Sequence, residues 1–336
     1  MSPSSSFTRR SLLGGLGAGA LLGLGACARG PAPRADEGSS PAPAGWSVEH
    51  KYGTTTIAAA PSRVVALGYT DQEPLLALGV VPVGVVDFFG ERPYGKWPWE
   101  QPLWNGATPQ IVGERDTYSF EKIAAAAPDL IVGLYSGMTR ADYTKLTKIA
   151  PTVAQPTGYA DFAVPWTALT ETVGRIVGKL PQAQQAIADT QAKFDQAKAA
   201  HPEWAGKTVA VAEPYKPAEW AVFGAADPKV QFMQGLGFTV APSVVELEPG
   251  GDVATLSTER LDVLDVDQLV LLVDAGDQTQ QQVEANKLFT GLGVSRGRTV
   301  FLPFGTEPPV GAALSFNSVL SIPYGIDRVV AALTAS

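Results

Sequence analysis

Residues 63–86 read RVVALGYTDQEPLLALGVVPVGVV, and this stretch decides the fold. Its apolar run 63–68 is typical of a buried strand, residues 71–78 have helical spacing, and the apolar run 80–86 begins another strand. Strand–helix–strand at this spacing favours a parallel sheet with a crossover helix. The alternation continues with a helix predicted at 120–126, a strand at 129–134 and a helix at 140–149.

The second half of the chain repeats this pattern, with a strand predicted at 208–212 and a helix at 230–236. Ser119 and Glu121 match Ser257 and Glu259 at an offset of 138 residues, and a strand follows each pair. Asp129 and Asp267, which open these strands, keep the same offset. A shared offset through a helix start and its following strand predicts two pseudo-equivalent α/β lobes.

The segment between the two halves predicts helices rather than strands. Apolar residues from 168 to 180 follow helical spacing, and Pro181 suits the start of a second helix that runs to residue 200. Twenty helical residues span about 30 Å, so we expect stiff lobes with limited closure. The predicted organisation is an N-terminal lobe at 46–165, connecting helices at 166–205 and a C-terminal lobe at 206–336.

The first 45 residues predict export and anchoring. Arg9 and Arg10 precede an uncharged, largely apolar stretch, which is the layout of a signal peptide, here residues 1–26. Residues 24–27, Leu-Gly-Ala-Cys, resemble the lipobox of bacterial lipoproteins, so Cys27 is the predicted lipid attachment point. The proline-rich residues 27–45 predict a tether. We therefore expect the folded part at the outer face of the cytoplasmic membrane.

Composition excludes several classes of protein. The chain has 336 residues, 45% of them hydrophobic, a formal net charge of −8 and a single cysteine. These values exclude general disorder, a disulfide framework and a cysteine-based metal cluster, and the acidic balance argues against nucleic acid. Loss of the leader's two arginines lowers the charge from −8 to −10.

Catalytic and metal-binding motifs are lacking in the sequence. His50 and His201 have no metal-ligand spacing, and we expect both to be solvated. Neither a nucleophile elbow nor a phosphate-binding loop follows a predicted strand. We therefore predict no catalytic residue, no metal site and no cofactor. A surface-anchored hydrolase using Asp71 or Glu213 stays open as an alternative.

Aromatic residues gather where the predicted strands end, which is where open α/β lobes bind ligands. Residues 88–104 hold six aromatic side chains in a proline-rich loop, and this loop predicts either a ligand contact or a local core. Neighbouring cations add charge. The candidate ligand-binding residues are Tyr69, Phe88, Phe89, Trp97, Trp99, Arg115, Tyr135, Arg140, Tyr215, Lys216, Trp220 and Phe223.

Several segments together resemble the iron–siderophore substrate-binding proteins of ABC transporters. The resemblance rests on residues 61–68, 76–85, 120–131 and 148–153, and it extends from about Pro61 to the C-terminus. It implies two Rossmann-like lobes joined by a single long helix, with a ligand cleft between the lobes. It also implies a monomer that delivers a ferric siderophore to a membrane permease.

The same resemblance leaves the cargo open, because the family includes haem and cobalamin binders. For haem, Tyr69, Tyr135 or Tyr215 is a possible axial ligand. A ferric siderophore already surrounds its iron, so the protein needs only aromatic surface, cations and hydroxyls.

The resemblance also implies a docking role for Glu121 and Glu259. In the family, one glutamate on each lobe docks onto arginines of the permease dimer, and these two residues match that pair. The simpler interpretation is that each carboxylate only stabilises a helix N-terminus.

Overall fold

The computed structural model describes residues 45–88, 97–115, 117–216, 218–247, 253–274 and 279–335. The predicted leader, nearly all of the predicted tether, and Cys27 and Phe89 lie outside this part of the chain.

The N-terminal lobe is built around a six-stranded sheet in the order β6-β5-β4-β3-β7-β8, in which β4, β3, β7 and β8 run parallel. Val65 pairs with Gly84 on one side and Ile131 on the other, which confirms the parallel strands predicted from residues 63–86. The elements are β1 (Trp46–His50), β2 (Gly53–Ile57), β3 (Val64–Ala66), α1 (Gln72–Ala77), β4 (Gly84–Asp87), η1 (Gln101–Leu103), β5 (Gln110–Glu114), β6 (Thr117–Tyr118), α2 (Phe120–Ala125), β7 (Leu130–Gly133), α3 (Arg140–Leu146), β8 (Thr152–Ala154) and α4 (Trp166–Ile176).

Helices cover both faces of this sheet. Along β3, Val64 and Ala66 pack with residues of α1 and α4, whereas Val65 packs with Ile123 of α2 and Leu146 of α3. Successive strand residues point to opposite faces, so a strand that is apolar throughout needs cover on both sides. The cover of both sheet faces by helices therefore explains why the apolar runs of the sequence are continuous.

The C-terminal lobe contains a sheet in the order β12-β10-β9-β13-β14, with β11 beside β9. Strands β9, β13 and β14 run parallel, while β10 is antiparallel to both of its neighbours. The elements are α5 (Leu180–Ala200), η2 (Pro202–Trp204), β9 (Thr208–Lys216), β10 (Glu219–Phe223), α6 (Pro228–Gly235), β11 (Thr239–Val240), α7 (Pro242–Leu247), β12 (Val253–Ser257), η3 (Thr258–Leu264), β13 (Gln268–Val273), α8 (Gln280–Glu284), α9 (Lys287–Thr290), η4 (Gly293–Ser295), β14 (Thr299–Pro303), α10 (Val310–Phe316) and α11 (Ser321–Ala335).

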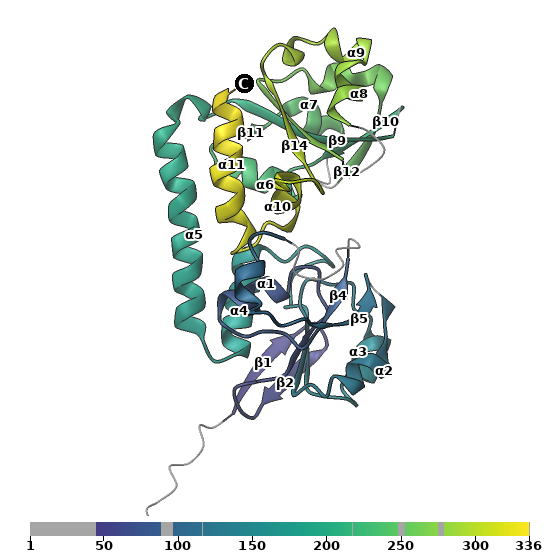
Figure 1. Ribbon diagram of the computed structural model, residues 1–336, viewed down its shortest axis with the longest axis vertical. Helices are drawn as coiled ribbons and strands as arrows, with labels where there is room; N and C mark the ends of the chain where they lie inside the picture. Colours follow the sequence, from purple (N-terminus) through teal and green to yellow (C-terminus); the bar gives the residue numbers. More distant parts are fainter. Residues whose placement is uncertain are drawn as a thin grey trace, which may run out of the picture. The chain divides into compact units, whose positions relative to one another are not determined.

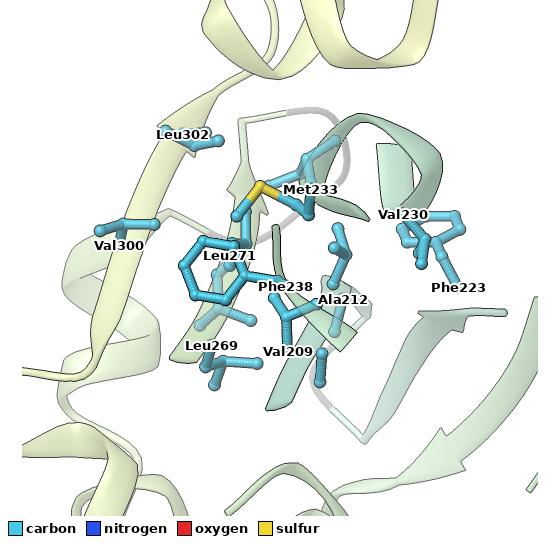
Figure 2. Packing of buried hydrophobic residues seen from close by; sticks show 14 of the residues in the cluster. Val209, Ala212, Phe223, Val230, Met233, Phe238, Leu269, Leu271, Val300 and Leu302 are labelled. Carbon is cyan, nitrogen blue, oxygen red and sulfur yellow. The ribbon is translucent and has the colours of Figure 1, made fainter. Parts of the chain in front are cut away.

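The core of this lobe is apolar and closely packed. Figure 2 shows Met233 and Phe238 against Leu271 of β13, with Val300 and Leu302 of β14 beside them. Each of these five side chains is no more than 4% exposed. This core lies between the sheet and its covering helices, as the predicted α/β architecture requires.

The two lobes share a structural detail at the repeated aspartates Asp129 and Asp267. Asp129, directly before β7, accepts hydrogen bonds from the backbone N–H of Ser62 (2.7 Å) and of Arg63 (2.9 Å) ahead of β3. Asp267, directly before β13, accepts one from the N–H of Thr208 (2.8 Å) at the start of β9. In both lobes a carboxylate therefore ties together the starts of two neighbouring parallel strands.

Helix α5 connects the lobes and packs against both of them. Ala183 near its start belongs to the core of the N-terminal lobe, whereas Phe194 and Ala197 near its end belong to the core of the C-terminal lobe. Its 21 residues correspond to about 30 Å, which confirms the long connecting helix (Figure 1). Within the described ranges, neither this helix nor any other has both the length and the apolar character of a membrane span.

A second contact joins the lobes away from α5. The rings of Trp97 and Trp99 stack at 5.4 Å, and both lie edge-on to Phe316 of α10, at 5.3 and 5.6 Å. Ala312 and Ala313 of α10 complete this cluster. Because rigid aromatic surface is buried at this second point, the lobes are held by packing as well as by the connecting helix.

Two buried glutamates lie beside this second contact. Glu100 accepts hydrogen bonds from Gln72 Nε2 (2.9 Å) and Trp104 Nε1 (3.4 Å), and the Ser318 hydroxyl, between α10 and α11, donates to Glu73 of α1. Both carboxyls are fully buried. Burial raises the pKa of Glu100 to about 7, and burial together with the nearby Glu100 raises the pKa of Glu73 well above its usual range.

This pair predicts a fall in stability with rising pH. The pKa of Glu100 is about 7 in the folded protein and 4.5 without burial. Between these values Glu100 is protonated in the folded protein and ionised in the unfolded chain, so its contribution to the free energy of unfolding decreases as pH rises and levels off above about pH 7. We expect Glu100→Gln to flatten this decline and to raise the unfolding midpoint at pH 7.5, measured by denaturant titration.

Glu284→Gln on the exposed face of α8 is the matched control and should leave the pH dependence as it is. Equal slopes for the wild type and Glu100→Gln would contradict the prediction.

Candidate functional site

Two adjoining cavities lie between the lobes, with volumes of about 500 and 320 Å³. The larger is lined by N-terminal-lobe residues such as Thr70, by residues 160–166 and Leu169, and by residues 226–228, Gln231, Phe316 and Asn317 of the C-terminal lobe. Both cavities are lined by Tyr135, Phe162, Asp227 and Pro228. We treat them as one interlobe cleft, of a size suited to a small organic ligand.

Five aromatic rings form one wall of the cleft. Tyr69 lies 5.3 Å from Phe88, 5.7 Å from Tyr135 and 5.1 Å from Phe316, measured between ring centroids. Phe162 completes the set, at 6.4 Å from Phe88 and 6.0 Å from Tyr135. Phe316 comes from the C-terminal lobe and the other four from the N-terminal lobe, so this aromatic wall spans both.

The carboxyl of Asp71 positions two of these rings. It accepts hydrogen bonds from the backbone N–H groups of Gly68 (3.0 Å), Leu134 (2.8 Å) and Tyr135 (3.0 Å). The N–H of Tyr69 also donates to the carbonyl of Tyr135 at 2.8 Å. The chain ends of β3 and β7 are thus joined beneath the aromatic wall.

Gly68 makes this arrangement possible, because a Cβ on this residue would lie 2.3 Å from the carboxyl atoms of Asp71. The carboxyl itself is completely buried, and burial raises its pKa to about 6 against the effect of the three N–H donors. Asp71 is therefore closed off from any substrate, which removes the carboxylate that the hydrolase alternative needed at this position.

Among the described residues, each lobe contributes two charged residues to the cleft lining: Arg115 and Asp161 from the N-terminal lobe, and Asp227 and Lys229 from the C-terminal lobe. Lys229 Nζ lies 3.0 Å from the carboxylate of Asp227 and 3.8 Å from the ring centre of Phe223. Burial raises the pKa of Glu213 of β9, and the charge of Lys229 opposes that rise. From the N-terminal lobe, Arg115 lines the smaller cavity.

Four of the sequence-predicted binding residues line the cleft, namely Tyr69, Phe88, Arg115 and Tyr135. Each follows a strand of the N-terminal sheet within a few residues. Parallel strands bring their carboxyl ends to one edge, so residues distant in sequence meet there. Phe89 falls outside the described residues.

Four of the predicted aromatic residues are packed in the interior rather than on the cleft. Trp97 and Trp99 are 2% and 8% exposed in the second contact between the lobes, which corresponds to the local-core interpretation of the loop. Trp220 is 1% exposed and stacks on Phe289 in the core of the C-terminal lobe. Phe223 is also buried, beneath Lys229.

The remaining candidates line neither of the two cavities. The Arg140 guanidinium lies 4.7 Å from the ring centre of Tyr52, a residue that lines neither cavity. Tyr215 donates to Glu219 at 3.0 Å, and Lys216 pairs with the same carboxylate at 3.2 Å. The strand predicted to end at residue 212 continues to Lys216 because it pairs with the antiparallel β10, so Tyr215 lies within a hairpin.

Sequence reasoning missed Phe162, Asp227, Lys229 and Phe316. Phe162 has a left-handed backbone (φ 57°) in a segment without periodicity, and Phe316 lies in an apolar helix that reads as core. Asp227 precedes Pro228 at the start of α6 and caps that helix by accepting from Lys229 N–H. The Asp-Pro pair, which is typical of a helix start, was the one feature of the sequence that could have indicated this part of the site.

The two candidate docking glutamates occupy corresponding places in the two lobes. Glu121 lies in the first turn of α2, and Glu259 lies in the first turn of η3, where its N–H donates to Ser257 Oγ. Both side chains are exposed, and neither forms an ion pair within the described residues. η3 is a 3-10 helix with a non-helical Arg260, so the repeat holds in position but not in helix type.

Among the described residues, no group of three or more His, Cys, Asp or Glu side chains is arranged to hold a metal ion. The prediction that His50 is solvated was wrong: its side chain is 2% exposed, and its Nε2 lies 2.9 Å from Thr55 Oγ1. The β1–β2 turn folds this ring against Tyr143, 5.2 Å away between centroids. His201 is half-buried and bonded to Glu203.

Comparison with known proteins places the chain in a family. The model of the periplasmic binding protein family matches residues 64–301, so the chain belongs to this family of substrate-binding proteins. A periplasmic solute binding protein from Mycobacterium smegmatis has the same fold, with a TM-score of 0.75 and 30% identity over 87% of this chain and 98% of that one.

Two of the relatives come from Bacillus subtilis. The probable siderophore-binding lipoprotein YfiY is 28% identical over 70% of this chain and 71% of its own length. The putative ABC transporter substrate-binding lipoprotein YhfQ is 32% identical, but the match spans only 45% of this chain and 46% of YhfQ.

Removal of the Asp71 carboxyl tests its positioning role. Asp71→Ala leaves three buried N–H groups without an acceptor, so we expect the free energy of unfolding to fall by about 3 kcal/mol or more. Asp142→Ala, which removes a half-buried carboxylate from the cap of α3, should cost about 1 kcal/mol or less. Denaturant titration of both variants measures the difference, and similar losses for the two would contradict the assigned role.

Proposed function

We propose that the protein binds a ferric siderophore in the interlobe cleft and delivers it to the permease of an ABC transporter. The observation that carries this proposal is the aromatic wall of Tyr69, Phe88, Tyr135, Phe162 and Phe316 on a cleft between two lobes. A siderophore supplies all the ligands of its iron, so its carrier has to bind an organic shell rather than a bare ion. Aromatic rings offer the apolar surface for that shell.

The relatives support this cargo. YfiY is described as a probable siderophore-binding lipoprotein, and a second Bacillus subtilis relative, YxeB, is described as an iron(3+)-hydroxamate-binding protein. Escherichia coli FecB, 28% identical over 48% of this chain, is described as an Fe(3+) dicitrate-binding periplasmic protein. These names share ferric iron held in an organic chelate.

Haem is the alternative cargo, and the chemistry of the candidate tyrosines argues against it. Ferric haem is ligated by a tyrosinate, so the phenol has to lose its proton. Burial, and then the charge of Asp227, raise the pKa of Tyr135 above its usual value, which opposes this loss. The hydroxyl of Tyr215 is bonded to Glu219, in a hairpin that lines neither cavity.

Binding of ferric complexes is the direct test. Trp166 lines the larger cavity, and Trp97 and Trp99 lie one ring behind Phe316, so ferric complexes should quench tryptophan fluorescence. We expect Tyr135→Ala to weaken binding about tenfold or more, because a buried aromatic contact is lost. Tyr215→Ala is the comparison and should leave affinity within about twofold.

The panel includes hydroxamate, catecholate and carboxylate complexes, and haem is added separately. Absence of quenching and of calorimetric heat with every ferric complex would overturn the proposed function. A Soret shift with haem that one tyrosine variant abolishes would favour the haem alternative.

Delivery to the permease is proposed to use Glu121 and Glu259. Each is an exposed carboxylate at the start of a corresponding segment in its lobe. A pair of like charges on two pseudo-equivalent lobes suits a dimeric partner with basic docking residues. The stabilisation of a helix start by one exposed carboxylate is a few tenths of a kcal/mol at this position, so its loss should leave the fold intact.

We expect Glu121→Ala/Glu259→Ala to reduce uptake of a radiolabelled ferric siderophore at least about tenfold, with ligand affinity unchanged. The double variant Glu49→Ala/Glu284→Ala, at two other exposed glutamates, should retain uptake. Full uptake by the Glu121/Glu259 variant would leave the two carboxylates with their local role only.

Anchoring through lipid on Cys27 completes the proposal. Cys27 directly follows the apolar leader and precedes the proline-rich residues 28–45, as expected for the first residue of a lipidated chain. Two of the relatives are described as lipoproteins. Labelling with a fatty-acid analogue that persisted in Cys27→Ser would contradict the anchor.

A further inference from the structure

The charges of the cleft restrict the kind of ferric complex it accepts. Four charged residues line the two cavities among the described residues: Arg115, Asp161, Asp227 and Lys229. Two are cations and two are anions, so their formal charges cancel. Among the residues that the structure describes, the aromatic cleft therefore has no excess of positive charge, unlike the site that a polyanionic ligand would require.

Lys229 is already neutralised within the protein. Its side chain is 11% exposed and pairs at 3.0 Å with Asp227, whose side chain is 10% exposed. The charge of Lys229 also acts on Glu213 of β9, where it opposes the rise in pKa that burial causes. A buried lysine that is paired with one carboxylate and interacts with the charge of a second has little positive potential left for a bound anion.

The helix start at the cleft is also occupied. Asp227 and Pro228, at the N-terminus of α6, line both cavities. A helix N-terminus attracts anions through its free N–H groups and its dipole. Here the carboxylate of Asp227 accepts the N–H of Lys229 at 2.8 Å, so the position that an anion would take holds the protein's own negative charge.

In the N-terminal lobe, the lining carboxylate of Asp161 is also paired with a lysine of the protein. Asp161 pairs with Lys51 at 2.6 Å, which leaves no net charge at that position. Arg115 forms no ion pair within the described residues, and it is therefore the one lining cation left to meet a ligand. Its left-handed backbone (φ 50°) follows β5, where its N–H donates to the carbonyl of Asp87.

Ferric siderophores differ in charge by their chelating groups. Three hydroxamates, each a monoanion, neutralise Fe³⁺ and give a complex without net charge from the chelate. Three catecholates, each a dianion, give a trianion, and citrate-type chelates are also anionic. The charges of the described lining residues cancel, so a trianion transferred among them would keep most of its charge uncompensated, which is costly at low dielectric.

We propose that the cleft selects ferric complexes without net negative charge, of the tris-hydroxamate type, and discriminates against tris-catecholate and citrate complexes. This inference rests on the proposed function. Asp227 is the specificity-determining residue, because it cancels Lys229 and occupies the start of α6. The aromatic wall, which has no charge of its own, then provides most of the contact surface.

The test compares dissociation constants of ferrichrome and ferrioxamine B, as hydroxamate probes, with those of ferric enterobactin and ferric citrate at physiological ionic strength. We expect the better hydroxamate to bind at least about tenfold more tightly than either anionic probe. Equal or tighter binding of ferric enterobactin or ferric citrate by the wild type would overturn the inference while leaving the proposed function intact. No binding of any probe would overturn both.

Asp227→Asn tests the charge within one ligand, so that differences in ligand shape cancel. Asparagine caps helices as well as aspartate does, so α6 should keep its start. The variant frees Lys229, and we expect the affinity for ferric enterobactin to rise about tenfold or more, with ferrichrome changed by less than about threefold. An unchanged preference in Asp227→Asn would contradict the role of this carboxylate.

Asp195→Asn on α5 is the matched control, because Asp195 also pairs with a lysine, Lys198 at 2.9 Å, and lines neither cavity. It makes the same change in net charge and should leave both affinities as they are. A rise in enterobactin affinity in this variant as well would assign the effect to the charge of the whole protein and would refute selection by the cleft.

Discussion

The carboxyl of Asp71 is the group on which the site depends. It accepts hydrogen bonds from three backbone N–H groups that follow the ends of β3 and β7, and it is completely buried. A buried carboxyl is stable only when its oxygens are satisfied, so the two chain ends have little freedom around it. These hydrogen bonds fix the backbone at Tyr135 and beside Tyr69. The aromatic wall is therefore formed in the absence of a ligand. Preorganisation of this kind reduces the entropy lost on binding.

The second constraint is the packing between the lobes. Helix α5 contributes to both cores, and the Trp97–Trp99 pair covers Phe316, which itself stacks on Tyr69. Phe316 thus belongs at once to the contact that joins the lobes and to the wall that faces the cleft. Any relative movement of the lobes changes the wall. The shape of the cleft is therefore coupled to the relative position of the lobes.

Much of the fold followed from local pattern. The apolar runs predicted β3, β4 and β7 and their parallel pairing, and the helical spacing after residue 166 predicted α4 and the long α5. The repeat of Asp129 and Asp267 predicted two pseudo-equivalent lobes, and each of these carboxylates joins two strand starts in its own lobe. The site was predicted less completely. Residues that closely follow strands, such as Tyr69 and Tyr135, were predicted and line the cleft. Phe316 lies in an apolar helix and was not predicted, whereas Trp220 was predicted as a binding residue but lies in the core.

The sequence by itself determined the class of fold, the two-lobed organisation and the aromatic character of the binding surface, because hydrophobic periodicity and strand-end position are local properties of the chain. Only the tertiary structure decided which aromatic and charged residues share the cleft. Whether Trp97 faces a ligand or another ring, and whether Lys229 is free or cancelled by Asp227, depends on neighbours that folding supplies. The net charge of a binding site is the sum of the charges of such neighbours, and it cannot be deduced from the overall charge of −8.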